Sequence, residues 1–386
     1  MIPKKLDEIS LSDLRALVTD QAREGKTLEF KRDQIGARDD DKREFLADIS
    51  ALANTLGGDL IVGIEETAGQ ASAICLLNVS DPDAEILRLE NMLRTGLEPR
   101  LPRIDVRWIS DPTGGGLIVI RVPRSWAAPH RVTFRDHSKF YARNSTAKYS
   151  MDVGELRSSF NSRESLPTRL RDFRMERLAT ISANDGPVAL NEGPVAVFHI
   201  LPLSAFTDPI TISPNEQTLF RPVRATGFNY LHTLEGFATY SGREDAESSR
   251  TYTLAFRNGI IEAAAHVGRQ NEDRSVIFPD SVEGALIEVV DSYFEQLQNM
   301  GVEPPFYVAL ALVGIRGYSL HTGTRRFFDA RPSIRRDALI LPEVFVDEPR
   351  PNTVTFLKPL FDLFWQAFGY QHSYSFDGTG RYIGDR

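Results

Sequence analysis

The sequence has little cysteine, no long hydrophobic run and no internal repeat, and each absence excludes a class of protein. The single cysteine, Cys75, allows neither an internal disulfide nor a zinc site built from several cysteines, so we expect a reducing, cytoplasmic setting. The longest apolar stretch, Phe306–Val313, is far shorter than the roughly 20 residues that span a bilayer, so no membrane partner is expected. No repeat of fixed period is visible, which argues against a solenoid or a propeller.

Length and turn-rich segments predict two domains. The chain has 386 residues, enough for two hydrophobic cores. Strand and helix patterns follow one another irregularly in both halves, which favours an α+β fold with two mixed α/β domains over a doubly wound sheet. The segment 184–194 contains two Gly-Pro pairs and predicts a linker. We therefore expect an N-terminal domain over residues 1–165, a helical segment and linker over 166–193, and a C-terminal α+β domain over 194–386.

Two local patterns give further structural predictions. Asn258-Gly259 separates two apolar, β-rich segments, 251–256 and 260–264, which predicts a tight β-hairpin. Residues 152 to about 183 have a helical pattern. Pro167 predicts an interruption in it, because proline lacks a backbone donor and clashes with the preceding turn.

Charge is unevenly distributed along the chain. The net charge is −8, yet residues 121–174 contain 12 Lys and Arg against 5 Asp and Glu, a net charge of +7. A phosphate backbone responds to such a local basic surface rather than to the global charge. The alternative is that these cations form ordinary surface ion pairs. The residues that could line a groove for a phosphate backbone are Arg121, Arg124, Arg131, Arg135, Lys139, Arg143 and Lys148.

Aromatic residues alternate with these cations. Trp126, Phe134 and Tyr141 could stack on bases, whereas Phe140 is better explained as strand core. His130, beside Pro129, is predicted to be a surface or turn histidine without a fixed catalytic partner.

Acidic residues gather at the ends of two predicted strands. Glu24 and Glu29 lie at the entry to a strand over residues 27–33, and Glu66 follows a buried strand over 60–64. If the strands pair, these acids could converge, and clustered carboxylates suit Mg²⁺ or Mn²⁺. Lys31, on the same strand face as Glu29, could add positive charge beside a scissile phosphate. The alternative is a solvated strand face.

Several segments together resemble a known domain. Over about residues 10–165 the chain resembles the Schlafen-type AlbA-2 domain, and beyond the linker it resembles no known family. The segments that carry the resemblance are Glu24–Lys31, Ile49–Glu66 with its Ala-Asn-Thr-Leu-Gly-Gly sequence, Val122–Ser125, Ala128–His130 and Phe140–Ser145.

The resemblance implies two different activities. Animal Schlafens are endoribonucleases for transfer and ribosomal RNA with three acids at a metal-dependent site, and these positions fall on Glu24, Glu29 and Glu66. The family usually has Asp at the third acidic position, whereas this chain has Glu66, whose side chain is longer by one methylene. Glu65 could serve instead. Many bacterial relatives are described as DNA-binding or regulatory proteins, some in phage-defence loci. The zinc site of the eukaryotic relatives is expected to be absent, because Cys75 stands alone.

A nucleotide-binding loop is not expected, although the family has also been described as ATP-binding. Gly25-Lys26-Thr27 matches the end of a P-loop, but the position of its first glycine is Asp20. A strand rather than a helix is predicted to follow, so the pattern does not predict a P-loop nucleotide site.

Three functions follow from these observations. The leading hypothesis is a nucleic-acid-binding protein that acts as an Mg²⁺- or Mn²⁺-dependent endoribonuclease on structured RNA such as tRNA, in bacterial stress or phage defence. Glu24, Glu29 and Glu66 would bind the metal and Lys31 would assist catalysis. The alternatives are a non-catalytic DNA-binding transcriptional regulator and a defence-complex scaffold. The C-terminal domain would then serve sensing, dimerisation or substrate selection, and a homodimer is one prediction.

Overall fold

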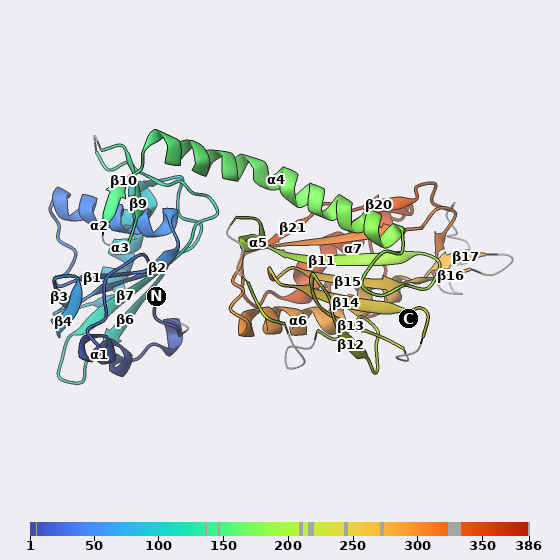
Figure 1. Cartoon of the computed structure of the whole chain (residues 1–386), viewed down its shortest axis with the longest axis horizontal. Coiled ribbons are helices and arrows are strands. Elements are labelled where there is room, and N and C mark those ends of the chain that lie inside the picture. Colours follow the sequence, from blue (N-terminus) through green and yellow to red (C-terminus); the bar gives the residue numbers. More distant parts are fainter. Residues whose placement is uncertain are drawn as a thin grey trace. The chain divides into compact units, whose positions relative to one another are not determined.

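The chain folds into two compact units, Met1–Ser165 and Leu166–Arg386 (Figure 1). The computed structural model describes residues 1–384 except 5, 136, 146, 208–210, 215–219, 243–245, 271–273 and 323–332, and it leaves the side chains of 162–164 undescribed. Both units combine helices with sheets, so the predicted α+β class is confirmed. Residues 166–193, expected as a separate segment, belong to the second unit.

The N-terminal unit is built on two small sheets and a hairpin. The strand that carries Glu29 pairs in parallel with the buried strand that precedes Glu66, with Glu29 opposite Leu60, so the condition set for convergence of the acids is met. The buried strand ends earlier than predicted, because Gly63 adopts φ +105° and the chain turns into the hairpin there. The first sheet has the order β1 (Leu28–Lys31), β2 (Gly57–Val62), β7 (Gly116–Pro123), β6 (Asp105–Ser110); the second has β10 (Lys148–Ser150), β9 (Lys139–Arg143), β8 (Arg131–Val132), β5 (Leu97–Glu98); the hairpin is β3 (Ile64–Thr67) and β4 (Gln70–Ile74).

Helix α2 (Asp39–Asn54) supplies much of this unit's core. Three acids in its first turn favour the helix dipole, and Phe45, Leu46 and Leu52 are completely buried. Each such side chain contributes about 1.5–3 kcal/mol by leaving water. The unit also contains η1 (Leu6–Glu8), α1 (Leu11–Thr19) and α3 (Pro82–Gly96).

Gly57, which follows α2, is required because the backbone of residues 122–124 passes close to it. Gly57 adopts φ +74°, and a Cβ there would lie 2.5 Å from the backbone nitrogen of Arg124. Gly69 has the same φ of +74°, but nothing lies within 4 Å of its Cβ position. We expect Gly57→Ala to lower the free energy of unfolding by about 1–3 kcal/mol more than Gly69→Ala, because only the first adds a backbone clash to the conformational strain. Urea denaturation of the two variants measures the difference, and equal losses would contradict the role of the clash.

The second unit is organised around one large antiparallel sheet. The hairpin predicted at Asn258-Gly259 is confirmed, since β14 and β15 pair with Thr251 opposite Ala265. The strand order is β12 (Asn229–His232), β13 (Gly236–Tyr240), β14 (Thr251–Phe256), β15 (Ile261–His266), β11 (Val195–Pro202), β18 (Phe306–Val313), β20 (Ala338–Ile340), and β21 (Val344–Val346) also pairs with β18.

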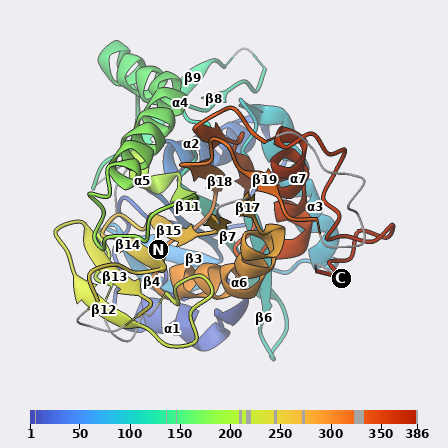
Figure 2. The same ribbon diagram turned by 90° about the vertical axis from the view of Figure 1, so that its right-hand side faces the viewer.

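Two helices cover one face of this sheet and form the core with it. They are α6 (Glu283–Asn299) and α7 (Thr353–Ala367), drawn in orange and red (Figure 2). The 3-10 turn η2 (Pro279–Ser281) directly precedes α6. The remaining elements are α5 (Ser204–Thr207), β16 (Gly268–Gln270), β17 (Ser275–Ile277) and β19 (Ser319–Leu320).

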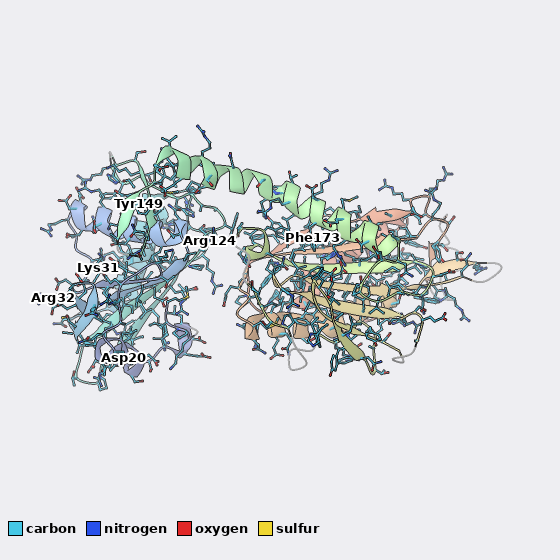
Figure 3. All side chains as sticks on the ribbon, in the orientation of Figure 1. Asp20, Lys31, Arg32, Arg124, Tyr149 and Phe173 are labelled. Carbon is cyan, nitrogen blue, oxygen red and sulfur yellow. The ribbon has the colours of Figure 1, made fainter. Side chains whose placement is uncertain are left out.

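Helix α4 (Val153–Ser182) runs through Pro167 without a break, so the predicted interruption is wrong. Its second half packs on the large sheet, and this packing offsets the roughly 3 kcal/mol that an internal proline costs. Phe173, labelled in Figure 3, makes edge-to-face contacts with His199 and Phe256 at 5.8 and 5.7 Å between ring centroids. Arg177 on the same helix forms a bidentate ion pair with Glu262 of β15.

Candidate functional site

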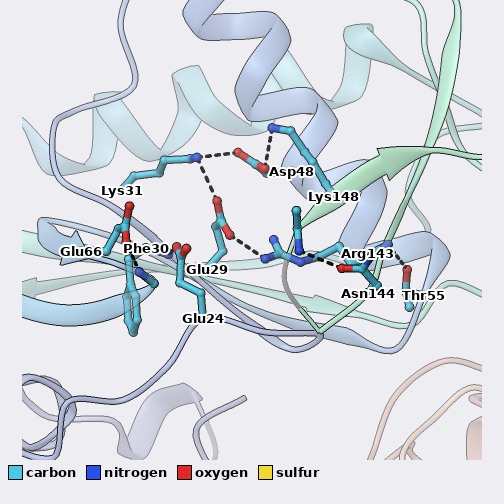
Figure 4. A network of polar contacts seen from close by, with 12 residues as sticks. Glu24, Glu29, Phe30, Lys31, Asp48, Thr55, Glu66, Arg143, Asn144 and Lys148 are labelled. Carbon is cyan, nitrogen blue, oxygen red and sulfur yellow. Dashed lines mark hydrogen bonds and ion pairs between the residues drawn. The ribbon is translucent and has the colours of Figure 1, made fainter.

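Five charged residues of the N-terminal unit form a continuous ionic network (Figure 4). They are Glu29 and Lys31 on β1, Asp48 on α2, Arg143 on β9 and Lys148 on β10, and we call them the ionic network. Lys31 Nζ lies 2.9 Å from both Glu29 Oε1 and Asp48 Oδ2. Lys148 Nζ lies 2.7 Å from Asp48 Oδ1, and Arg143 Nη2 lies 2.7 Å from Glu29 Oε2. The network therefore ties together four elements that are distant in sequence.

Strand alternation and the buried face of α2 produce this arrangement. Glu29 and Lys31 point to the same side of β1 because successive residues of a strand alternate. Asp48 is only 1% exposed, since it lies one turn from Phe45 and from Leu52 on the apolar face of α2. A buried carboxylate costs several kcal/mol unless it is paired, and the two lysines supply that pairing.

The pairing also sets the protonation states in the network. Burial by itself would lower the pKa of Lys31, but the charges of Asp48 and Glu29 raise it above its usual value. Burial would raise the pKa of Glu29, but the charges of Lys31 and Arg143 hold it below its usual value. Both groups are therefore charged at neutral pH.

Glu24 lies close enough to interact with the two other predicted acids, Glu29 and Glu66. Glu24 Oε1 accepts a 2.8 Å hydrogen bond from the Phe30 amide, and Glu66 Oε2 accepts one of 2.6 Å from the Gly69 amide. Burial raises the pKa of Glu24 to about 7, and the charges of Glu29 and Glu66 add to that rise. Glu65 instead pairs with Arg32, with 3.4 Å between charged atoms.

The acids as arranged do not fit a metal site. Both oxygens of Glu29 are already paired with cations, and the other two carboxylates accept backbone hydrogen bonds. Among the residues that the structure describes, no group of three or more Asp, Glu, His or Cys side chains could hold a metal ion. We therefore assign no step to a metal, and the Mg²⁺ or Mn²⁺ requirement stays a prediction.

The predicted phosphate-binding cations occupy three kinds of position. Arg121 and Arg143 are largely buried: Arg121 forms a bidentate pair with Asp59 at 2.8 and 3.0 Å and donates to the Ile2 carbonyl, so it fixes the N-terminal segment. These two have little surface to offer to a phosphate backbone. Lys148 is partly buried in the ionic network. The four others are at least partly exposed. Arg131 pairs with Glu98, and Arg135 pairs with Asp39. Arg124 and Lys139 are exposed, and Lys139 has no ion pair with a described residue.

His130 is not a surface histidine; it is completely buried. Its Nε2 lies 2.6 Å from Ser125 Oγ and its Nδ1 lies 2.7 Å from the Pro99 carbonyl, while its amide donates to Asn54 Oδ1 at 2.7 Å. The prediction failed because the carbonyl and hydroxyl that satisfy the imidazole are fixed only by the tertiary fold.

Sequence reasoning missed Asp48 and Glu44, which bind the two lysines of the network. The sequence did contain a signal for Asp48. It lies three residues after Phe45 and four before Leu52, so on a helix it falls on the apolar face. A charge in that position requires a buried partner.

Comparisons with known proteins agree with the resemblance predicted for the N-terminal half. Residues 24–152 match the family model described as Schlafen, AlbA_2, so that resemblance is confirmed. One similar solved structure is a protein from Corynebacterium diphtheriae, 18% identical, covering 38% of this chain with a TM-score of 0.26. This chain spans only about a quarter (27%) of that protein.

A second similar solved structure is the N-terminal domain of a protein described as related to the DNA helicase RecG, from Nitrosomonas europaea. It is 20% identical, the match covers 38% of this chain and 94% of that one, and the TM-score is 0.28. No curated protein matches this chain. Across the described ranges of the chain, no helix has the length and apolar character needed to cross a membrane.

Proposed function

We propose that the N-terminal unit binds nucleic acid at the surface around the ionic network. The observation that supports this most directly is that two partly exposed cations, Lys31 and Lys148, converge from β1 and β10 within the segment that matches the AlbA_2 model. The side chains of Lys31 and Lys148 are 26% and 18% exposed, so a phosphate can reach them. A phosphate that displaces the exposed Glu44 from the two lysines leaves the buried Asp48 paired, and release of counterions from the nucleic acid favours binding.

The finer proposal is that the substrate is structured RNA such as tRNA and that the site cuts its backbone. The charge of Glu24 interacts with those of Glu29, Glu66 and Lys31, and the Lys31 ammonium would neutralise charge that develops on a scissile phosphate. The position that the family usually fills with Asp is Glu66 here, and it is held by the Gly69 amide. Bacterial stress or phage defence as the setting, a cytoplasmic location and a homodimer stay predictions.

We expect Glu29→Ala to abolish cleavage, because it removes the carboxylate that positions both Lys31 and Arg143. The measurement is incubation of the purified chain with tRNA, ribosomal RNA, single-stranded DNA and duplex DNA, in Mg²⁺, Mn²⁺ or EDTA. The matched control is Glu90→Ala, an exposed acid on α3 outside the network. The nuclease is supported if wild type and control give discrete RNA products and Glu29→Ala gives at least tenfold less product while still binding RNA. Unchanged cleavage by Glu29→Ala would refute the proposed site.

A second candidate is binding without cleavage, as in a DNA-binding regulator or the scaffold of a defence complex. It is favoured by the observation that Glu29 and Asp48 are each neutralised by two cations. It predicts salt-sensitive binding, no products from any of the four substrates, and loss of affinity in Lys31→Ala or Lys148→Ala rather than in Glu24→Ala. A scaffold predicts instead a stoichiometric protein complex and little affinity for nucleic acid.

A further inference from the structure

The loop between β8 and β9 lies against the start of α2. The Nζ of Lys42 on α2 lies 5.9 Å from the centre of the Phe134 ring, and Arg135 forms an ion pair with Asp39 in the first turn of that helix. The guanidinium carbon of Arg135 lies 5.8 Å from the centre of the same ring. Phe134 is partly exposed and packs against the core of the N-terminal unit. These contacts hold one aromatic ring and two cations together at the surface.

His137 and Tyr141 form an aromatic pair in the same segment. Their rings are nearly parallel, with 11° between the planes and 5.9 Å between the centroids, and His137 Nε2 lies 2.7 Å from the Tyr141 hydroxyl. Because this hydrogen bond joins the edges of the rings, the rings lie side by side and neither covers the face of the other. The His137 amide donates a 3.2 Å hydrogen bond to the Phe134 carbonyl, which keeps the third ring close. We call Phe134, His137 and Tyr141 the aromatic surface.

The pair of rings is held in place before any ligand binds. Both rings are partly exposed, and Tyr141 packs against the core of the unit. Asn54 Nδ2 on α2 donates a 2.9 Å hydrogen bond to the Tyr141 carbonyl, which fixes this part of β9 to the helix. Burial and the charges of Arg43 and Lys139 lower the pKa of His137, so its imidazole is neutral at neutral pH. A preorganised flat surface loses little conformational freedom when a flat ligand binds to it.

The aromatic surface continues the ionic network along β9. Side chains alternate along a strand, so Lys139, Tyr141 and Arg143 point to one face of β9. Arg143 belongs to the network, and Lys148 of the network lies opposite it on β10. Tyr141 is two residues from Arg143, which corresponds to about 7 Å along the strand. A nucleic acid strand whose phosphate contacts Lys31 and Lys148 can therefore place a neighbouring base on the aromatic surface.

We propose that the aromatic surface stacks an unpaired base, so that the N-terminal unit binds single-stranded nucleic acid in preference to a duplex. Bases inside a duplex are covered by their neighbours, whereas an unpaired base has a free face that stacks on aromatic side chains. Lys42, Arg135 and Lys139 beside the rings attract the phosphates that flank such a base. In a folded RNA the base would come from a loop or an end. The inference rests on the function proposed for the N-terminal unit and specifies which nucleic acids this site accepts.

Fluorescence anisotropy of the full-length chain with labelled RNA tests the inference. The probes are a single strand and the duplex that the same strand forms with its complement. The test variants are His137→Ala and Tyr141→Leu, the second of which keeps an apolar contact with the core but lacks a flat ring. The matched control is Tyr149→Leu, which changes an exposed tyrosine opposite Ala142 on β10, and therefore on the other face of the sheet from Tyr141 (Figure 3).

We expect wild type to bind the single strand about tenfold or more tightly than the duplex, because only the single strand offers an unpaired base. His137→Ala and Tyr141→Leu should each weaken binding of the single strand about fivefold or more and leave binding of the duplex unchanged, whereas Tyr149→Leu should change neither. Tyr141→Phe keeps the ring and should bind the single strand within about twofold of wild type.

Two lysine variants separate this inference from the proposed function. Lys31→Ala and Lys148→Ala remove contacts to phosphates, which both probes carry, so they should weaken binding of both. If wild type binds neither probe, or if the lysine variants bind both as tightly as wild type, the proposed function fails and the inference fails with it.

Other outcomes overturn the inference alone. They are that the lysine variants bind both probes weakly while wild type binds the two probes equally, or that the folded aromatic variants bind the single strand as tightly as Tyr149→Leu does. Circular dichroism checks folding. If Tyr141→Leu does not fold, His137→Ala decides the test, because the His137 side chain is partly exposed.

Discussion

Arg177→Ala is expected to lower the free energy of unfolding of the second unit by about 3–5 kcal/mol. Glu262 is fully buried, and its carboxylate is held by four hydrogen bonds: two from Arg177 at 2.8 Å, one from the Tyr252 hydroxyl at 2.8 Å, and one with His199 at 3.1 Å. Burial alone would raise the pKa of Glu262, but Arg177 and His199 lower it to about 2. Removing the guanidinium leaves this carboxylate buried with its main counter-charge gone.

Thermal and urea denaturation of the full-length chain measure this loss. Arg350→Ala removes an exposed ion pair with Glu295 and is expected to change stability by less than about 0.5 kcal/mol. The double substitution Arg177→Met with Glu262→Leu should recover much of the lost stability, because it removes the unpaired charge together with its partner. A loss below about 1 kcal/mol in Arg177→Ala would show that the ion pair does not hold α4 to the sheet.

Glu283→Gln is expected to stabilise the second unit at pH 8 and to leave it unchanged near pH 4. Glu283 is fully buried at the start of α6, where its Oε1 accepts a 2.9 Å hydrogen bond from Trp365 Nε1, while its Oε2 is buried without a hydrogen bond from a described residue. Burial raises the pKa of this carboxyl from 4.5 to about 7.

The direction of the pH effect follows from proton binding. Between pH 4.5 and about 7 the folded state holds a proton that the unfolded chain has lost, so the stability due to Glu283 is complete below pH 4.5 and is lost as the pH rises through 7. Above pH 7 the buried charge costs about 3 kcal/mol. Gln keeps the acceptor for Trp365 and carries no charge. The stability difference between variant and wild type, measured from pH 4 to pH 8, should therefore grow with pH, and a constant difference would rule out the shifted carboxyl.

Local patterns in the sequence predicted those features that depend on neighbouring residues. Asn258-Gly259 predicted its hairpin because only a few residue types adopt the backbone conformation of that turn. Glu29 and Lys31 were placed on one strand face by alternation alone. Pro167 misled the same reasoning, since the packing of α4 on the second unit outweighs the local cost of the proline.

The candidate site itself was decided by contacts between distant segments. The sequence alone determined an α+β chain with an AlbA-2-like N-terminal half and named Glu24, Glu29, Lys31 and Glu66, because these features depend on residue type and short-range spacing. Only the tertiary structure showed that Glu29 is neutralised by Lys31 and Arg143, and that Arg121 is used to hold Asp59. The physical reason is that the partner of a charge depends on which chain segments meet in space, and that is settled by burial of the core rather than by the order of residues.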